Sequence, residues 1–564
     1  MQGTLIVAVA SVLAAGTFVG KTFADDDHDQ DHSYRFEFQP GTLVLSRSVY
    51  VGNASTVTIG ETLPLGCAGG PNGSTVVKVP TTTAGTTTAV TVPCGIASDN
   101  GEAPNLFDSH NVWNNANTDG SFGVSSPIFL DDITTDGWVL GSLPIPSDQI
   151  VTSFSSKSEL ALNRSIDGKS ITFMAYQGGP GCGGYPVSPT APNLLDVSAS
   201  NTPGVCDPTN PVITTYQSGS VVPTAYYRAV AEVDAHGNLS ITDGNAYSGD
   251  NGRAAIKGAS SLYYMVGNDN SGNLSKKQIP ITPDGIDLIN ATGSELLVPG
   301  ATPPVPPNID MIGRLLFGTD KPGKDTNFRG MTIFNNTLYV SKGSGGNGIN
   351  TVYQVGSAGV LPTGTAAELA TVPIAILPGF PNTAASTSTA FPFGIWFADA
   401  NTLYVCDEGD GTLVTPAVNG NVADAQSLAT AGLQKWSLVN GTWTMLYVLQ
   451  DGLNIGVPYS VRNYPASLNP ATGGCRNITG RHNFDGTVTI YAITSTISAN
   501  GDQGADPNKL VKVTDLLSAT SLPTPDGNPY HSLGHFITLR SAKAGEVFRG
   551  VAFAPEDYPE FWGN

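Results

Sequence analysis

The stretch FRGMTIFNNTLYVSKGSGG, residues 328–346, carries the pattern that decides the fold. A short apolar segment, Met331 to Phe334, precedes an Asn-Asn pair, and a second segment, Thr337 to Ser341, leads into a glycine-rich loop. Apolar segments rich in β-branched and aromatic residues on either side of an Asn-containing turn are typical of a β-hairpin. We therefore predict an antiparallel hairpin here.

Related hairpins recur along the chain. The first kind is found at residues 159–176, 252–266, 328–340, 393–405 and 477–493. A second, less regular kind follows it, with its clearest copies at 226–242 and 432–449. Pairs of antiparallel hairpins that are apolar on both faces predict four-stranded propeller blades, because one pair alone cannot bury both faces. The sequence thus predicts an all-β protein with a single β-propeller domain at residues 41–564.

The two ends of the chain complement each other. FRGVAFAP, residues 548–555, is half of such a hairpin, and TLVLSRSVYV, residues 42–51, lacks its leading strand. Their pairing would form a composite blade, close the ring and remove free sheet edges. Counting the hairpins favours six blades. Seven remains open, because residues 277–317 match poorly and contain a proline-rich insertion at 298–307.

The composition agrees with this fold and limits the partners. The chain is 40% hydrophobic and 13% charged, and has 66 Gly and 40 Pro among 564 residues, which suits short strands joined by turns. A net charge of −20 argues against nucleic acid and against anionic membranes as partners.

The N-terminus indicates secretion. An apolar run from Leu5 to Gly20 precedes the small-residue site Thr22-Phe23-Ala24, which predicts a signal peptide at residues 1–24. The acidic, histidine-bearing leader at 25–40 reads as a disordered, solvated segment rather than a metal site. No later apolar run is long enough to span a membrane. We expect a secreted, extracellular monomer.

Two further features fit an extracellular chain. An even number of cysteines favours disulfides. Sequence neighbours suggest Cys67–Cys94 and Cys182–Cys206, which leaves Cys406–Cys475. Asn-x-Ser/Thr sequons permit glycosylation, in number no greater than chance provides. The candidate glycosylation sites are Asn53, Asn72, Asn238, Asn335 and Asn440.

The long loops all fall at one predicted face of the ring, above all 52–125 and 177–224, whereas the opposite turns are tight. Loop elaboration on one face marks it as the place for a site. Residues at the start of the innermost strands would surround the channel mouth there. They include the ligand-binding candidates Arg253, Arg329, Arg476, Arg549, Asn251 and Asn327, with Asn477 beside them.

Two interpretations of these arginines stay open. Guanidinium groups that converge on a channel mouth would bind a carboxylate, phosphate or uronic acid through forked hydrogen bonds. Alternatively, each arginine pairs with an acid of a neighbouring blade and fastens the blades together. The candidate acids are Asp407, Glu408, Asp410, Asp502 and Asp506.

Catalytic candidates are sparse. Glu159 is a channel-mouth acid able to act as a base, and His482 lies on an innermost strand, where it either faces the channel or packs in the core. We expect no cofactor and no metal. The acidic loops at 406–410 and 501–506 would be the places for Ca²⁺, but they lack a recognised ligand spacing and read better as solvated turns.

The closing FRGVAFAP, the FRGMTIFNNTLYV hairpin and the GLQKWSLVNGTW hairpin resemble a family of uncharacterised secreted propeller proteins from bacteria and plants. The resemblance covers nearly the whole mature chain and implies no particular activity. More distantly, the chain is similar to six-bladed propellers of the strictosidine-synthase, paraoxonase and NHL kind. Members with catalytic Ca²⁺ place carboxylates and Asn amides at the channel mouth, where this chain has arginines.

Three functions follow as hypotheses. The first is an extracellular propeller that binds a polar or anionic small molecule or glycan at the channel mouth. The second is a non-redox enzyme, a hydrolase, lyase or cyclase, that uses the same pocket with Glu159 or His482 as base. The third is a structural or adhesive extracellular protein, because fold alone does not fix function.

Overall fold

The computed structural model places the described strands in one compact unit, Phe36–Asn564. The predicted signal peptide and the leader up to residue 35 lie outside the described part. The structure describes residues 36–49, 62–63, 74–80, 87–93, 95–98, 114–115, 125–147, 149–154, 156, 158–177, 228–244, 247, 252–259, 262–269, 285–290, 311–317, 320–321, 326–343, 348–384, 390–410, 429–464, 466, 469–497, 504, 506–524 and 532–557.

One sheet contains strands from both ends of the chain, in the order β31-β1-β8-β9. Its strands are β1 (Leu43–Val49), β8 (Ile128–Ile133), β9 (Val139–Pro144) and β31 (Glu546–Phe553). β1 pairs antiparallel with β31 on one side and with β8 on the other. Most β1 side chains are buried because both faces of the sheet are covered: Val44 packs in one hydrophobic cluster, and Leu43 and Leu45 pack in another.

A six-stranded sheet follows, with the order β14-β13-β12-β10-β7 and β11 on β12. Its strands are β7 (Ser125–Ser126), β10 (Ile150–Ser153), β11 (Asn163–Arg164), β12 (Ser170–Gln177), β13 (Arg228–Asp234) and β14 (Leu239–Gly244). β11 and β12 are the hairpin predicted at residues 159–176, and Gly168 takes the positive φ that its Asp-Gly turn requires.

An eight-stranded sheet consists of two halves. The strands are β15 (Gly252–Lys257), β16 (Leu262–Asp269), β17 (Gly285–Asn290), β18 (Met311–Leu316), β19 (Thr326–Phe334), β20 (Thr337–Lys342), β21 (Thr351–Val355) and β22 (Ile374–Ile376). Two residue pairs between β16 and β19 join the halves. Residues 277–317, which match the repeat poorly in sequence, supply β17 and β18 as ordinary antiparallel neighbours. The proline-rich insertion at 298–307 lies outside the described residues.

Two four-stranded sheets complete the series. The first contains β23 (Pro392–Asp399), β24 (Thr402–Asp407), β25 (Gly432–Val439) and β26 (Thr442–Leu449). The second contains β27 (Ala471–His482), β28 (Thr487–Ile497), β29 (Lys509–Leu516) and β30 (Ile537–Ser541). Both are two successive hairpins, as the repeat predicts.

Smaller elements lie outside these sheets. They are β2 (Thr62–Leu63), β3 (Ser74–Pro80), β4 (Thr87–Pro93), β5 (Gly95–Ser98), β6 (Asn114–Asn115) and α1 (Ala366–Leu369). The segment at 52–125, expected to be a loop, thus contains strands, because its Thr- and Val-rich runs favour extended backbone. Most of 177–224 lies outside the described residues. The single turn α1 is held by a capping box between Thr365 and Glu368.

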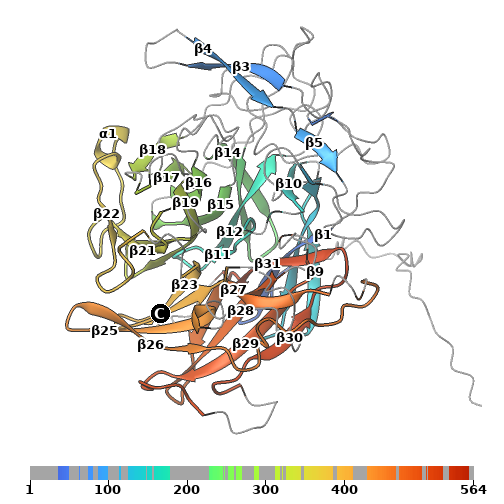
Figure 1. Ribbon diagram of the computed structural model, residues 1–564, viewed down its shortest axis with the longest axis vertical. Helices are drawn as coiled ribbons and strands as arrows, with labels where there is room; N and C mark the ends of the chain where they lie inside the picture. Colours follow the sequence, from blue (N-terminus) through green and yellow to red (C-terminus); the bar gives the residue numbers. More distant parts are fainter. Residues whose placement is uncertain are drawn as a thin grey trace, which may run out of the picture. The chain divides into compact units, whose positions relative to one another are not determined.

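The sheets form a propeller arrangement (Figure 1). β15 contacts β19, β19 contacts β23, β23 contacts β27, and β27 contacts β31. Hydrophobic cores fill the spaces between sheets. One cluster joins Tyr404 and Leu433 to Ile490 and Val511 of the next sheet. The predicted all-β propeller class is therefore confirmed. Among the described residues, no helix is long and apolar enough to cross a membrane.

Candidate functional site

Four buried arginines share one backbone feature. Arg253 in β15, Arg329 in β19, Arg476 in β27 and Arg549 in β31 each lie where strand pairing is interrupted by extra residues. Such a bulge re-aims a side chain out of the regular in–out alternation of a strand. All four arginines are at most 4% exposed. The recurring Arg of the inner hairpins is thus a bulge residue.

Glycine at these bulges allows neighbouring sheets to approach closely. A Cβ on Gly330 would overlap the backbone oxygen of Phe393, and a Cβ on Gly394 would overlap that of Arg476. Phe393-Gly394 occupies the interrupted pairing of β23, so it corresponds to Arg329-Gly330 of β19. In β19 and β23 the side chain of the first bulge residue therefore differs, while the glycine after it lets the backbones approach closely.

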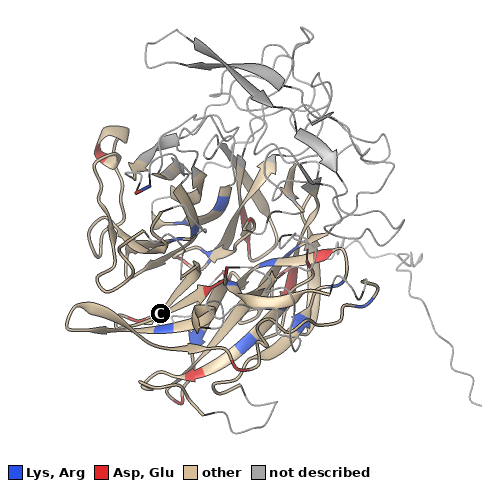
Figure 2. Cartoon of the chain, in the orientation of Figure 1, with Lys and Arg blue, Asp and Glu red and all other residues tan. Residues whose placement is uncertain are grey.

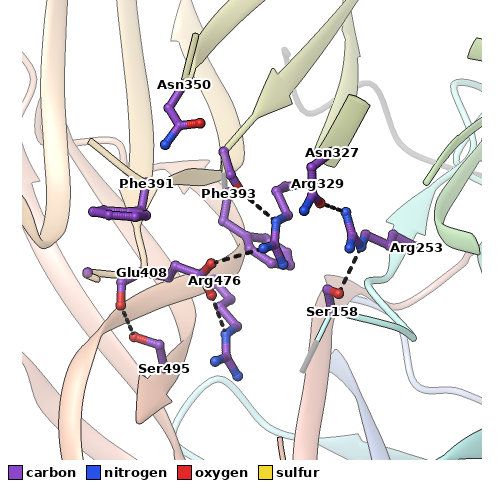
Figure 3. Close-up of polar contacts among 12 residues, drawn as sticks. Ser158, Arg253, Asn327, Arg329, Asn350, Phe391, Phe393, Glu408, Arg476 and Ser495 are labelled. Carbon is purple, nitrogen blue, oxygen red and sulfur yellow. Dashed lines mark hydrogen bonds and ion pairs between the residues drawn. The ribbon is translucent and has the colours of Figure 1, made fainter. Parts of the chain in front are cut away.

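Glu408, which directly follows β24, lies between two of the arginines (Figure 3). Its Oε2 accepts a hydrogen bond from Nε of Arg476 at 3.0 Å, and its Oε1 lies 3.7 Å from Nη2 of Arg329. The hydroxyl of Ser495 donates to its backbone oxygen at 2.6 Å. Opposite charges therefore meet where the inner strands adjoin (Figure 2). For these two arginines, one shared carboxylate makes the blade-to-blade pairing that the sequence offered as an alternative.

The guanidinium of Arg476 keeps one buried donor unused. Its Nη2 has no hydrogen-bond partner among the described residues, although Arg476 is only 3% exposed. Leaving a buried donor unpaired costs about 1–3 kcal/mol, and more for a charged group. Such a nitrogen in a native structure calls for an acceptor, which an ordered water or a ligand can provide.

The other two arginines bind neutral acceptors. Arg253 donates from Nε to Oγ of Ser158 at 2.8 Å and from Nη1 to Oδ1 of Asn327 (Figure 3). Arg549 donates to two backbone carbonyls, one of them that of Phe154. Arg253 thus links β15 to β19, and Arg549 links β31 to the chain that follows β10 of the neighbouring sheet.

Asp407, beside Glu408, titrates near neutral pH. Burial raises the pKa of its carboxyl to about 7, and the charge of Glu408 acts in the same direction. Three donors oppose this shift: the backbone N–H groups of Phe391 and Gly409 and the amide of Gln434, at 2.9–3.0 Å. The interpretation of 406–410 as a solvated turn is wrong for Asp407, because β24 extends to this residue and its side chains are buried.

A disulfide between Cys406 and Cys475 fixes both sides of the ion pair. The two Cα atoms are 5.2 Å apart. Cys475 directly precedes Arg476, and Cys406 lies two residues before Glu408, so the bridge ties β24 to β27 beside the shared carboxylate. It is the pair left by neighbour pairing in the sequence. Cys67, Cys94, Cys182 and Cys206 lie outside the described residues.

The two candidate bases lie in different surroundings. Glu159 is 1% exposed, and its carboxylate accepts hydrogen bonds from Oγ1 of Thr152 at 2.8 Å and from the hydroxyl of Tyr176. His482 is exposed at the far end of β27, with its ring against the backbone oxygen of Ala398. It lies six residues beyond Arg476, about 20 Å along the strand. Placing His482 at the channel or in the core is therefore corrected.

The asparagine candidates for ligand binding differ in their hydrogen-bond partners. Asn327 accepts the Arg253 bond, and Asn251 lies outside the described residues. Oδ1 of Asn477 accepts from the backbone N–H of Val551 at 2.6 Å, which links β27 to β31. Among the described residues, no group of three or more His, Cys, Asp or Glu side chains forms a metal-ion site.

Sequence reasoning missed a buried charge network between two sheets. Nζ of Lys435 lies 3.0 Å from Asp515, and the hydroxyls of Tyr404 and Tyr447 donate to the same carboxylate at 2.5–2.9 Å. Lys435 also donates to the backbone oxygen of Leu516 and two further carbonyls at 2.8–3.1 Å. The alternation of apolar and polar residues in KWSLV gave no sign that this lysine is buried.

Comparisons with known proteins give distant structural similarities. No protein-family model matches the chain, and no curated protein matches its sequence. A glucose dehydrogenase structure has 11% identity and a TM-score of 0.31, and covers 69% of this chain and 92% of its own. A Thermus thermophilus oxidoreductase described as a glucose dehydrogenase has 12% identity and a TM-score of 0.26, with coverage of 67% and 94%. The parainfluenza virus 5 hemagglutinin-neuraminidase ectodomain has 8% identity and a TM-score of 0.30, with coverage of 68% and 74%. Scores of this size carry no inference about activity.

Proposed function

We propose that this protein is a secreted propeller that binds an anionic small molecule or glycan at the arginines of its inner strands. The buried, unpartnered Nη2 of Arg476 carries the proposal. Arg329 and Arg476 both contact the carboxylate of Glu408, so two guanidinium groups lie at one place. A ligand carboxylate or phosphate would supply the acceptor for Nη2 of Arg476.

The proposal includes a closed ring of six blades. Hydrogen bonds between neighbouring sheets support it at the junction where the chain ends meet. Oγ of Ser46 in β1 donates to the backbone oxygen of Leu160 at 2.8 Å, and Asn477 of β27 accepts from Val551 of β31. β31 also contacts β11, and β12 contacts β15, as a closed ring requires.

The chemistry of the site favours oxyanions. A guanidinium presents its N–H groups in a planar fork that matches a carboxylate or phosphate. The site is largely closed to water, which strengthens each charge-assisted hydrogen bond. A uronic acid combines such a carboxylate with sugar hydroxyls, and it is the glycan class that best fits these donors.

Calorimetric titration of the purified protein with inorganic phosphate and with glucuronate tests the proposal. Arg476→Lys keeps a cation beside Glu408 but removes Nη2, so affinity should fall by about tenfold or more, since a charge-assisted hydrogen bond contributes about 1.5–3 kcal/mol. Arg481→Ala is the matched control, an exposed arginine farther along the same strand. Equal affinity of Arg476→Lys and the native protein would overturn the proposal.

A structural or adhesive role is the second candidate, favoured by Arg253 and Arg549. Arg253 links β15 to β19 through Asn327, and Arg549 bonds to backbone carbonyls beside β10 of the neighbouring sheet. This role predicts no heat of binding with phosphate or glucuronate, and a lower free energy of unfolding when Arg253 or Arg549 is replaced. The non-redox enzyme remains a prediction, and it needs a base other than Glu159, whose carboxylate already accepts two hydroxyl donors. The proposal of an extracellular protein includes two further disulfides, Cys67–Cys94 and Cys182–Cys206.

A further inference from the structure

Sequons lie in two structurally distinct settings. Those whose asparagine side chains the structure describes are Asn163, Asn238, Asn335, Asn440 and Asn477. N-glycosylation in a folded protein needs an asparagine whose carboxamide reaches solvent, because the glycan is bulky and hydrophilic. Exposure therefore separates usable sequons from chance matches, which the sequence alone does not achieve. Asn53 and Asn72 lie outside the described residues.

Asn335 and Asn440 meet this requirement. Asn238 is also exposed, but its Nδ2 donates a hydrogen bond to Oδ2 of Asp234 at 2.8 Å. Asn335 and Asn440 are exposed at the tips of tight hairpin turns, β19–β20 and β25–β26, with φ of 46° and 51°. The left-handed conformation is one that asparagine adopts readily. No hydrogen bond of either carboxamide nitrogen is found among the described residues. Both nitrogens are therefore available for substitution.

Two other sequons provide internal contrast. Nδ2 of Asn163 donates to the backbone oxygen of Ala255 at 3.0 Å, in the neighbouring sheet. Asn477 is 6% exposed and links β27 to β31 through Val551. A glycan on either nitrogen would separate sheets that these amides join, so neither sequon is compatible with the folded chain.

The exposed sequons lie at the end of the sheets away from the arginines. Asn335 follows β19, and Arg329 lies near the start of that strand, about 20 Å away along it. The backbone N–H of Leu438 donates to the oxygen of Asn401 in the β23–β24 turn, so the turn with Asn440 lies at the corresponding end of its sheet. Glycans there would leave the arginine site uncovered.

We propose that Asn335 and Asn440 are N-glycosylated, and that glycans mark the face opposite the arginines. Nδ2 forms a bond to the anomeric carbon of an oligosaccharide carried on a lipid pyrophosphate. The bond from that carbon to the pyrophosphate oxygen breaks, the lipid pyrophosphate leaves, and Nδ2 gives up a proton. The proposal does not rest on anion binding.

Mass spectrometry of the full chain secreted from eukaryotic cells tests this. Amidase release of N-glycans in ¹⁸O-water labels each formerly glycosylated asparagine as aspartate. We expect the label at Asn335 and Asn440 and none at Asn163 or Asn477, with Asn401, an exposed turn asparagine without a sequon, as the control.

The opposite pattern would overturn the proposal. If neither Asn335 nor Asn440 of the secreted protein carried the ¹⁸O label, exposure at these turns would not lead to glycosylation. Label at Asn163 or Asn477 would contradict the argument from burial. The double variant Asn335→Gln/Asn440→Gln should lose the mass of two glycans and bind phosphate with unchanged affinity; a tenfold change in affinity would contradict the separation of the two faces.

Discussion

Removing the Cys406–Cys475 disulfide should lower the free energy of unfolding by about half of a typical domain's stability. The bridge closes a loop with a sequence separation of 69 residues. In the chain-entropy model, a loop of this length stabilises the folded state by about 4.4 kcal/mol, because it restricts the unfolded chain. Both cysteines are completely buried, so deleting the sulfur atoms leaves small cavities that add about 1 kcal/mol each.

The test uses Cys406→Ala/Cys475→Ala, which avoids leaving a single unpaired thiol in the core. Urea unfolding followed by circular dichroism should give a loss of about 4–7 kcal/mol for the double variant, against a total of roughly 5–15 kcal/mol for folded proteins. Ser341→Ala is the matched comparison. The Ser341 hydroxyl donates a hydrogen bond to the backbone oxygen of Phe393, so it also joins two neighbouring sheets. Losing this hydrogen bond should lower the free energy of unfolding by only about 1 kcal/mol. A loss below about 1 kcal/mol for the cysteine variant would refute the reasoning.

Three further variants probe the same region. Gly394→Ala should destabilise by about 1–3 kcal/mol in thermal unfolding, because its Cβ would overlap the backbone oxygen of Arg476; an unchanged Tm would contradict the close approach. Asp407→Asn should flatten stability against pH: the folded pKa of about 7 exceeds the ordinary value of about 3.9, so native stability falls as pH rises between these values. If the free energy of unfolding of Asp407→Asn, measured with urea at several pH values, depended on pH as in the native protein, the raised pKa of Asp407 would be refuted. Lys435→Met should cost about 3–5 kcal/mol in urea unfolding by leaving Asp515 without its cation; a neutral result would show that the two tyrosine hydroxyls suffice.

The repeat pattern predicted the fold because hairpins are local. The Asn335-Asn336 turn adopts the two positive φ values that a two-residue hairpin turn requires, and its flanking segments pair as β19 and β20. The repeated Phe-Arg-Gly also located two of the arginine bulges correctly in the chain. What it did not reveal is that each Arg is the extra residue of a bulge, since bulges are defined by the partner strand.

The site was less predictable because its contacts cross between sheets. Sequence reasoning named Glu408 as one of several acids, but only the arrangement of sheets brings it between Arg329 and Arg476. The burial of Asp407 depends on how far β24 extends. The position of His482 depends on the length of β27, whose last two residues reach solvent. None of these distances is encoded in local periodicity.

Anomalous diffraction from crystals soaked in arsenate, a phosphate analogue with a strong arsenic signal, tests the central claim most directly. The anion-binding account predicts an arsenic peak whose oxygens lie about 3 Å from Nη2 of Arg476, and no peak there in Arg476→Lys crystals. An ordered water or a protein acceptor on Nη2, with no arsenic signal at this position, would contradict the account and make Arg329, Glu408 and Arg476 a structural fastening between sheets.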